Sequence, residues 1–272
     1  MAAFADASTG RLLVAQLIFS LVAAGCFMAF LALAWVPVIR EASHALPEAA
    51  AISGAKLQWP GDQPVLLSEG SRLAIVADPG DAATAGRAAD LQLELCSTRL
   101  RLRSELGYVE WPYSAGWRVS LGRADAVPWW GARQPWFVAL AGAALVAKLF
   151  AAWWLLAMVV APVARALAFF GDRAATWPGC MRLAGAAWLP GSLVMSLAIL
   201  LYGLEALALP GLAFAVVSHG FIGAVYLCGA PFRLAKISTV KSAPAKGVNP
   251  FAAPPDGPAS PAEPPAPPAA AS

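Results

Sequence analysis

A single lysine interrupts a long uncharged stretch of the sequence. Within "GAALVAKLFAAWW" (142–154), Lys148 is the only charged residue between Gln134 and Ala164. It follows Trp136 by twelve residues, or about 18 Å of helical rise. A lysine at the depth of a lipid bilayer has a partner, reaches the interface with its flexible chain, or marks a functional site.

Two other polar residues have a comparable setting. His219 follows Pro210 by nine residues, or about 14 Å of helix, so its side chain reaches a depth similar to that of Lys148. Glu205 lies near the outer end of the same apolar region. The sequence predicts a polar site within the membrane formed by Lys148, His219 and Glu205. It leaves open whether the lysine is structural, bonded to backbone carbonyls or His219 or snorkelling, or lines a path for a ligand or protons.

Other side chains give little sign of catalysis. The two histidines, His44 and His219, lie in different predicted compartments, and the four cysteines have no paired spacing, so we predict no zinc site. No glycine-rich loop stands between a strand and a helix, and a serine nucleophile in the external part would have only His44 as its base. We expect no catalytic residue, no metal and no cofactor, which favours a protein that is not an enzyme.

The composition is that of a membrane protein. Hydrophobic residues make up 59% of the chain and charged residues 13%, against about a quarter charged in an ordinary soluble domain. A helix needs about 20 apolar residues to cross the hydrocarbon core. Four stretches are long enough, and they predict a bundle of four transmembrane helices at 12–39, 134–164, 183–204 and 206–232.

Basic residues orient these helices. The segments 1–11, 165–182 and 233–272 carry arginines and lysines, whereas the turn at Glu205 has none. Such residues next to spans are retained in the cytoplasm. Residues 40–133 carry ten basic and eleven acidic residues, but a translocated domain of that length is largely exempt from the charge rule. Both termini are therefore predicted to be cytoplasmic, and residues 40–133 to lie outside a bacterial cytoplasmic (inner) membrane. The lipid bilayer is the expected partner, and the net charge of +3 is too small to predict nucleic-acid binding.

One alternative concerns the first helix. "LVAAGC" (21–26) resembles a lipoprotein signal, in which cleavage would leave a lipidated Cys26 at the N-terminus. However, Ala23 stands where leucine is favoured, and the apolar run continues well beyond Cys26. We therefore favour a transmembrane helix.

Residues 40–133 are predicted to form a folded unit. "RLAIVAD" (72–78) is typical of a buried strand that ends at a turn, and residues 91–95 and 99–103 alternate with a period of two, as half-buried strands do. "GYVEWPY" and "GWRVSL" can supply two more strands. Cys96 is the only cysteine of this segment, so its core has no disulfide. We predict a small β-rich α+β extracytoplasmic domain inserted between helices 1 and 2.

The C-terminal segment has a different composition. From Ser242 to Ser272 there are ten prolines and three charged residues, and such a sequence cannot build a core. We predict that residues 233–272 form a disordered Pro/Ala-rich cytoplasmic tail.

The layout of one N-terminal span, a strand-rich external domain and a C-terminal group of spans resembles a bacterial domain-of-unknown-function family, whose named members are maltodextrin-utilisation membrane proteins. The local likeness lies in "GAKLQWPGDQPVLL" (54–67) and "LAIVADPGDAATAG" (73–86). There a short strand with a proline precedes a hydrophobic strand ending in aspartate. The resemblance implies a polytopic membrane protein and no established activity.

These observations lead to two hypotheses about function. We predict an integral membrane protein, non-catalytic, whose external domain (residues 40–133) binds or senses a protein partner or an envelope ligand. The alternative is a transporter accessory subunit or a membrane-embedded enzyme that uses an intramembrane site at Lys148 and His219. The sequence does not predict an oligomeric state.

Overall fold

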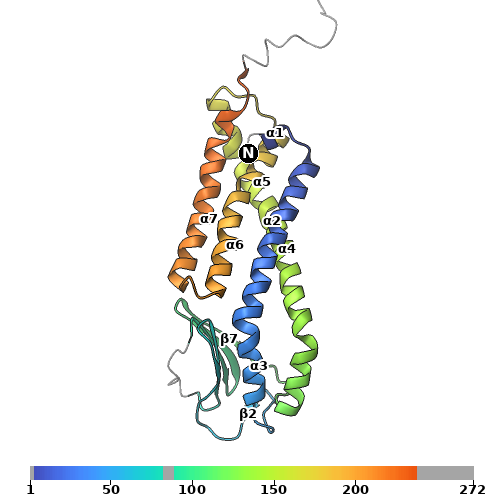
Figure 1. The fold of residues 1–272 in the computed structure, drawn as a ribbon, viewed down its shortest axis with the longest axis vertical. Helices are drawn as coiled ribbons and strands as arrows, with labels where there is room; N and C mark the ends of the chain where they lie inside the picture. Colours follow the sequence, from blue (N-terminus) through green and yellow to red (C-terminus); the bar gives the residue numbers. More distant parts are fainter. Residues whose placement is uncertain (1–2, 82–88, 238–272) are drawn as a thin grey trace, which may run out of the picture.

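A computed structural model describes residues 3–81 and 89–237, in which a bundle of long helices carries two small β-sheets at one end (Figure 1). The predicted tail lies largely outside these residues. The helical elements, in chain order, are α1 (Ala3–Asp6), α2 (Thr9–Phe30), the π-helical turn η1 (Leu31–Trp35), α3 (Val36–Ala45), α4 (Arg123–Phe170), α5 (Trp177–Ala187), α6 (Leu189–Gly203), α7 (Leu209–Gly229) and the 3-10 turn η2 (Pro231–Arg233).

Four helical segments are long and apolar enough to cross a membrane: Thr9–Ala45, Arg123–Phe170, Trp177–Gly203 and Leu209–Arg233. The prediction of four long apolar helices is thereby confirmed. Three of them extend by several residues beyond the predicted spans, and the third does so by beginning at Trp177. The first continues through η1 and α3 to Ala45, and α4 begins at Arg123. Residues 123–133, which the sequence analysis placed in the external domain, are thus the first turns of α4.

Charged residues set the predicted ends of the spans, but they do not end a helix. Arginine is nearly as good a helix former as alanine, so Arg123 and Arg133 continue α4. The third segment does have a break, because α5 and α6 meet at Trp188, just before Pro190. Proline has no N–H to donate and crowds the preceding turn, which interrupts the ladder of helical hydrogen bonds there.

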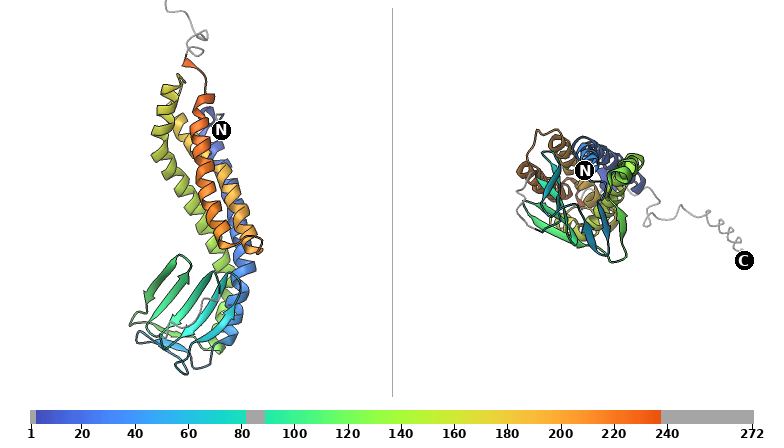
Figure 2. Two further views of the ribbon diagram at one scale, coloured as in Figure 1. Left: turned by 90° about the vertical axis from the view of Figure 1, so that its left-hand side faces the viewer. Right: turned by 90° about the horizontal axis from the view of Figure 1, so that it is seen from below.

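The β-sheets lie at the end of the bundle opposite the N-terminus, and the larger sheet packs against α3 through β3 and β4 (Figure 2). The larger sheet has the order β3-β4-β5-β6-β7, in which only the β4–β5 pair is parallel, and the smaller has the order β2-β1-β8. The strands are β1 (Ala51–Ser53), β2 (Lys56–Gln58), β3 (Val65–Glu69), β4 (Leu73–Asp78), β5 (Leu91–Cys96), β6 (Arg99–Ser104), β7 (Gly107–Pro112) and β8 (Arg118–Ser120). The strands predicted at 72–78, 91–95 and 99–103 are found as β4, β5 and β6.

The larger sheet has one apolar and one polar face. Along β5, Leu91, Leu93 and Leu95 pack toward a core formed with α3 and β4, while Gln92 and Glu94 lie buried on the other face. This alternation follows from the period of two in an extended strand. The apolar face is the one that turns to the helices.

Small residues allow the helices of the bundle to approach closely. Four alanines of α4 are buried against α5 and recur at helical spacing: Ala157, Ala161, Ala164 and Ala168. Side chains this small bring two backbones together, which is how helices associate in an apolar solvent.

The end of the bundle remote from the sheets is basic. There the guanidinium of Arg182 donates to the carbonyl oxygen of Ala5 at 2.6 Å, and that of Arg173 donates to the carbonyl oxygen of Leu234 at 2.7 Å. These contacts hold the N-terminal segment and the segment that follows α7 at the same end of the bundle.

Substitutions at two glycines of α7 test this close packing. A Cβ added at Gly223 would lie 2.6 Å from Cζ3 of Trp188, so we expect Gly223→Ala to destabilise the bundle by about 1–3 kcal/mol through overpacking. The measurement is the thermal unfolding midpoint of the purified chain in detergent solution.

Gly220→Ala is the matched control, because an added Cβ there meets no atom within 4 Å. It should be neutral or stabilising by up to about 1 kcal/mol, since alanine is the better helix former. Equal midpoints for the two variants would contradict the packing of α7 against Trp188.

Candidate functional site

Lys148 lies on the exposed side of α4. The next residue, Leu149, packs against the buried cluster that contains Trp153. Within residues 3–81 and 89–237, Lys148 makes no hydrogen bond or ion pair. Its flexible chain is therefore free to extend along the helix surface rather than into a space between helices.

His219 lies on α7, against the junction of α5 and α6. Its ring centroid is 6.4 Å from that of Trp188, and its Nδ1 would lie 3.1 Å from a Cβ added at Gly191. His219 Nδ1 and Trp188 Nε1 are both buried and have no hydrogen-bond partner among the described residues. The imidazole is held here by ring packing.

Glu205 occupies the turn between α6 and α7, where its backbone φ is 61°. Its carboxylate accepts a hydrogen bond from the hydroxyl of Ser71, in the turn that precedes β4. The structure does not bring the three predicted site residues together, since the described contacts link Lys148 to neither His219 nor Glu205. Glu205 instead joins the bundle to the larger sheet.

Arg72 is the centre of that junction. Its guanidinium forms an ion pair with Asp90, with Nη1 2.7 Å from Oδ2. The same group donates from Nε to the carbonyl oxygen of Tyr202 at 3.0 Å and from Nη2 to that of Leu207 at 2.8 Å. It also lies 4.2 Å from the centroid of the Tyr202 ring. One buried side chain of the sheet thus binds the end of α6 and the turn that follows.

The surroundings of Arg72 compensate its burial. Only 8% of the residue is exposed, and a buried charge is tolerated when it is paired and hydrogen-bonded. Asp90 supplies the opposite charge and also accepts a hydrogen bond from the hydroxyl of Tyr202 at 2.9 Å. The carbonyl oxygens at the end of α6 carry the negative end of the helix dipole, which favours a cation.

Sequence reasoning missed Arg72. The available signal was a charged residue directly before an apolar strand, which by itself indicates only where the strand begins. Its partners Tyr202 and Leu207 lie more than a hundred positions away, and no local pattern connects them.

We expect Arg72→Met to destabilise the chain by about 2–3 kcal/mol, which is less than the loss of a partner in a fully buried pair because Asp90 keeps some contact with water. Thermal unfolding followed by tryptophan fluorescence measures this change. Arg118→Met is the control, since Arg118 is exposed on β8 and its loss should leave the midpoint unchanged. A midpoint for Arg72→Met equal to that of the control would show that the junction is not stabilising.

A cavity of about 690 Å³ lies between the apolar face of the larger sheet, α3 and the first turns of α4. Its walls are mostly aliphatic and aromatic, and they include Ile39, Ala42, Leu46, Leu67, Ile75, Leu93, Leu95, Val119, Leu121, Ala126, Trp129, Trp130 and Phe137. The larger sheet, β8 of the smaller sheet, α3 and α4 each supply part of the wall, so the cavity exists only when sheets and helices are assembled.

The polar groups of this cavity are mostly engaged with one another. The Ser43 hydroxyl donates to the carbonyl oxygen of Arg40 at 2.6 Å, and the Ser120 hydroxyl donates to a carboxylate oxygen of Asp125 at 2.5 Å. One buried donor is left, because Nε1 of Trp130 has no hydrogen-bond partner among the described residues. The cavity therefore presents a mostly apolar surface with one buried indole N–H that lacks a partner.

Aromatic rings and an arginine line the part of α4 that borders the cavity. Phe137 stacks on Trp130 at a centroid distance of 5.9 Å and packs against Trp129 at 5.8 Å. The guanidinium of Arg133 lies 5.0 Å from the ring of Trp129. A second, smaller hollow of about 190 Å³ is lined by Arg133, Trp136, Phe137 and Leu140, so Phe137 borders both hollows.

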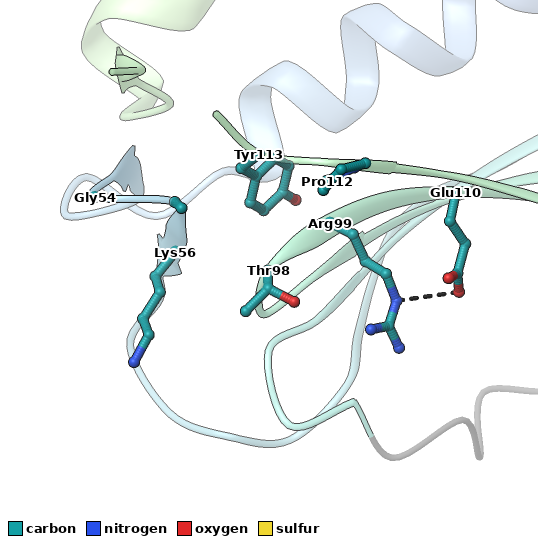
Figure 3. A pocket seen from close by; sticks show the side chains of 8 residues that line it. Gly54, Lys56, Thr98, Arg99, Glu110, Pro112 and Tyr113 are labelled. Atoms are coloured by element: carbon teal, nitrogen blue, oxygen red, sulfur yellow. Dashed lines mark ion pairs between the residues drawn. The ribbon is translucent and has the colours of Figure 1, made fainter. Parts of the chain in front are cut away.

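A third pocket, of about 560 Å³, lies apart from these two hollows in its lining residues and is more polar (Figure 3). Arg99 and Glu110 face each other in it, with Nε 3.0 Å from Oε1. The side chain of Lys56 points away from this pair (Figure 3). Burial raises the pKa of Tyr113, whose hydroxyl has no hydrogen-bond partner among the described residues. Because Glu110 already neutralises the charge of Arg99, an anionic ligand would be attracted to this arginine less strongly than the residues of the pocket suggest.

The polar face of the larger sheet forms a closed network. Arg101 donates to Glu110 at 2.8 Å and to the buried Glu94 at 3.0 Å, and these bonds, led by the one to Glu110, raise the pKa of Arg101. Glu94 is also 3.5 Å from Arg103. Among the described residues, no three His, Cys, Asp or Glu side chains group as a metal site would require. The ion pairs on this face therefore stabilise the pairing of β5, β6 and β7.

Cys96 ends β5 on this polar face, and burial raises the pKa of its thiol to about 11. A raised pKa keeps the thiol protonated and unreactive at neutral pH, because the thiolate is the reactive form. We expect iodoacetamide at pH 8 to modify Cys96 only after denaturation, as read by mass spectrometry. An exposed control, Ser114→Cys, should react in the native protein, and rapid native modification of Cys96 would contradict its burial.

Comparison of the chain with protein-family models, curated proteins and solved structures found no match.

Proposed function

We propose that this chain is an integral protein of a bacterial cytoplasmic membrane, with both termini in the cytoplasm and residues 40–133 outside. The four apolar helices support this, because each is long enough to cross a bilayer. The basic contacts of Arg173 and Arg182 lie at the end of the bundle that carries the N-terminus, and the sheets lie at the other end (Figure 1). Basic residues next to spans favour the cytoplasmic side.

The external domain binds an apolar or amphipathic component of the cell envelope. The observation that carries this function is the cavity of about 690 Å³ between the sheet, α3 and α4, since ligand sites have volumes of about 300–1,000 Å³ and mostly apolar walls. Water is a poor occupant of such a space because it finds few polar partners there. A ligand with a largely apolar surface restores the contacts that the walls lack.

The chemistry of the walls supports binding rather than catalysis. Ser120 and Asp125 bond to each other, and Ser43 bonds to the backbone, so none of these is arranged as a nucleophile with a free base. We accordingly propose a non-catalytic role in which the bundle anchors the domain and Arg72 fixes its position. The resemblance to maltodextrin-utilisation membrane proteins stands beside this proposal as a hypothesis about ancestry.

The alternative function, a transporter accessory subunit or membrane-embedded enzyme, requires a shared polar site at Lys148 and His219. It has less support, because Lys148 is exposed and His219 packs against Trp188, and no described contact joins the two residues. The apolar cavity therefore supports the binding function over this alternative.

Filling the cavity tests the proposal. Ala42 is buried in its wall, and we expect Ala42→Phe to weaken binding of the apolar dye N-phenyl-1-naphthylamine about tenfold or more, equivalent to at least 1.4 kcal/mol. Dye fluorescence is titrated with the full chain held in amphipol, so that no lipid competes. Ala126→Phe fills the same cavity from α4 and serves if Ala42→Phe lowers the unfolding midpoint.

The control is Ala151→Phe, which adds the same side chain on an exposed position of α4. It should leave dye affinity unchanged. Equal dye binding by the wild-type chain and both cavity-filling variants would refute a binding function for this cavity.

A further inference from the structure

The cavity continues toward the helix bundle along α4. Asp125, Ala126, Trp129 and Trp130 line it successively, and Phe137, two turns farther along the helix, lines both the cavity and the smaller hollow of about 190 Å³. The two hollows therefore share one lining side chain. Their linings run from the interior of the external domain to the exposed surface of α4, and a rotation of the Phe137 side chain would join them into one track.

The other end of this track lies at the level where α6 ends. Ala141 packs in the cluster of Phe30, Leu31 and Tyr202, and Tyr202 is in the last turn of α6. In the proposed topology this is the outer boundary of the hydrocarbon. Trp136 and Leu140 are 76% and 67% exposed there, so acyl chains of the outer leaflet would contact them directly.

From this geometry we infer that the cavity receives an acyl chain of an anionic phospholipid, which enters from the outer leaflet past Phe137. The inference rests on the proposed function and names its ligand. Lipid is favoured over a soluble apolar molecule because the track opens on the surface that faces the bilayer. A tail that follows the track stays in apolar surroundings along its whole path and is never transferred through water.

Arg133 supplies the recognition of the headgroup. It lines the smaller hollow, is exposed, and within residues 3–81 and 89–237 its charge has a ring contact with Trp129 but no carboxylate partner. A guanidinium binds phosphate oxygens through paired N–H donors. Asp125, the carboxylate of the cavity, lies eight residues away, or about 12 Å along the helix, so it does not cancel the charge at the mouth.

The buried indole of Trp130 adds a second polar contact. Its Nε1 has no acceptor among the described residues, and an ester carbonyl near the top of an acyl chain is an acceptor of the kind it lacks. Specificity for a lipid over a plain hydrocarbon would come from Arg133 and Trp130. The aliphatic wall of the sheet would hold the remainder of the tail.

Photo-crosslinking tests the inference with the full chain in nanodiscs. The discs contain phosphatidylcholine and a small fraction of phosphatidylglycerol that carries a diazirine at the end of one acyl chain. We expect cross-links on Leu93 or Leu95 of β5, which line the cavity and which a tail that remains in the bilayer does not reach. Ala42→Phe should abolish these cross-links, while those on the exposed Leu155 of α4 persist.

The headgroup is tested by Arg133→Gln. Its yield of β5 cross-links from phosphatidylglycerol should fall about fivefold, because a basic residue beside an anionic lipid contributes an attraction of that order. Arg123→Gln is the matched control, since Arg123 is also exposed on α4 but borders neither hollow. Equal yields from both variants would overturn the role of Arg133.

The two proposals fail in different ways. If cross-links appear only on the bundle while the chain in amphipol still binds the dye, the lipid inference is wrong and the cavity binds another apolar component. If the dye also fails to bind, both proposals are refuted. Cross-links on β5 that Ala42→Phe leaves unchanged would show that the tail reaches the sheet by another route, and would likewise refute the inference.

Discussion

The binding of Arg72 to the end of α6 is the contact on which the arrangement of the two halves depends. The larger sheet stands beside α3 at one end of the bundle (Figure 2) and packs on it through an apolar core. A guanidinium that pairs with Asp90 and also binds two carbonyl oxygens allows few orientations of the sheet. Because a buried charge is costly without its partners, the same residue that orients the sheet also makes separation of the halves unfavourable.

The cavity is a consequence of that fixed orientation and of helices that continue past the bundle. Helix α3 prolongs the first apolar helix, and α4 begins well before its predicted span. Both projecting ends face the apolar side of the larger sheet, and further contacts hold them there: Ser68 donates to Glu41 at 2.8 Å, and Arg40 donates to Gln134 at 3.3 Å. The elements are joined at their edges and leave an apolar space between them. This apolar space, rather than any reactive group, is what supports the proposed binding function.

The candidate site also shows why polar residues in long apolar helices cannot be assigned a role before their positions in space are known. Lys148 and His219 have comparable depths by residue count, and depth alone made a shared site plausible. Position around the helix decides the matter, because each residue turns by about 100° relative to the last and a helix shows only one side to its neighbour. Lys148 is exposed, while His219 packs against Trp188.

The sequence by itself determined the elements whose signals are local. Uncharged runs gave four apolar helices, and alternation in 91–95 and 99–103 gave strands, because hydrophobic periodicity reports the repeat of the backbone. It did not determine where α4 begins, since arginine is compatible with helix and with loop alike. Only the tertiary structure decided the partners of Arg72, the outward side of Lys148 and the cavity between sheet and helices. Each of these depends on residues far apart in the chain, which packing brings together and which no local pattern encodes.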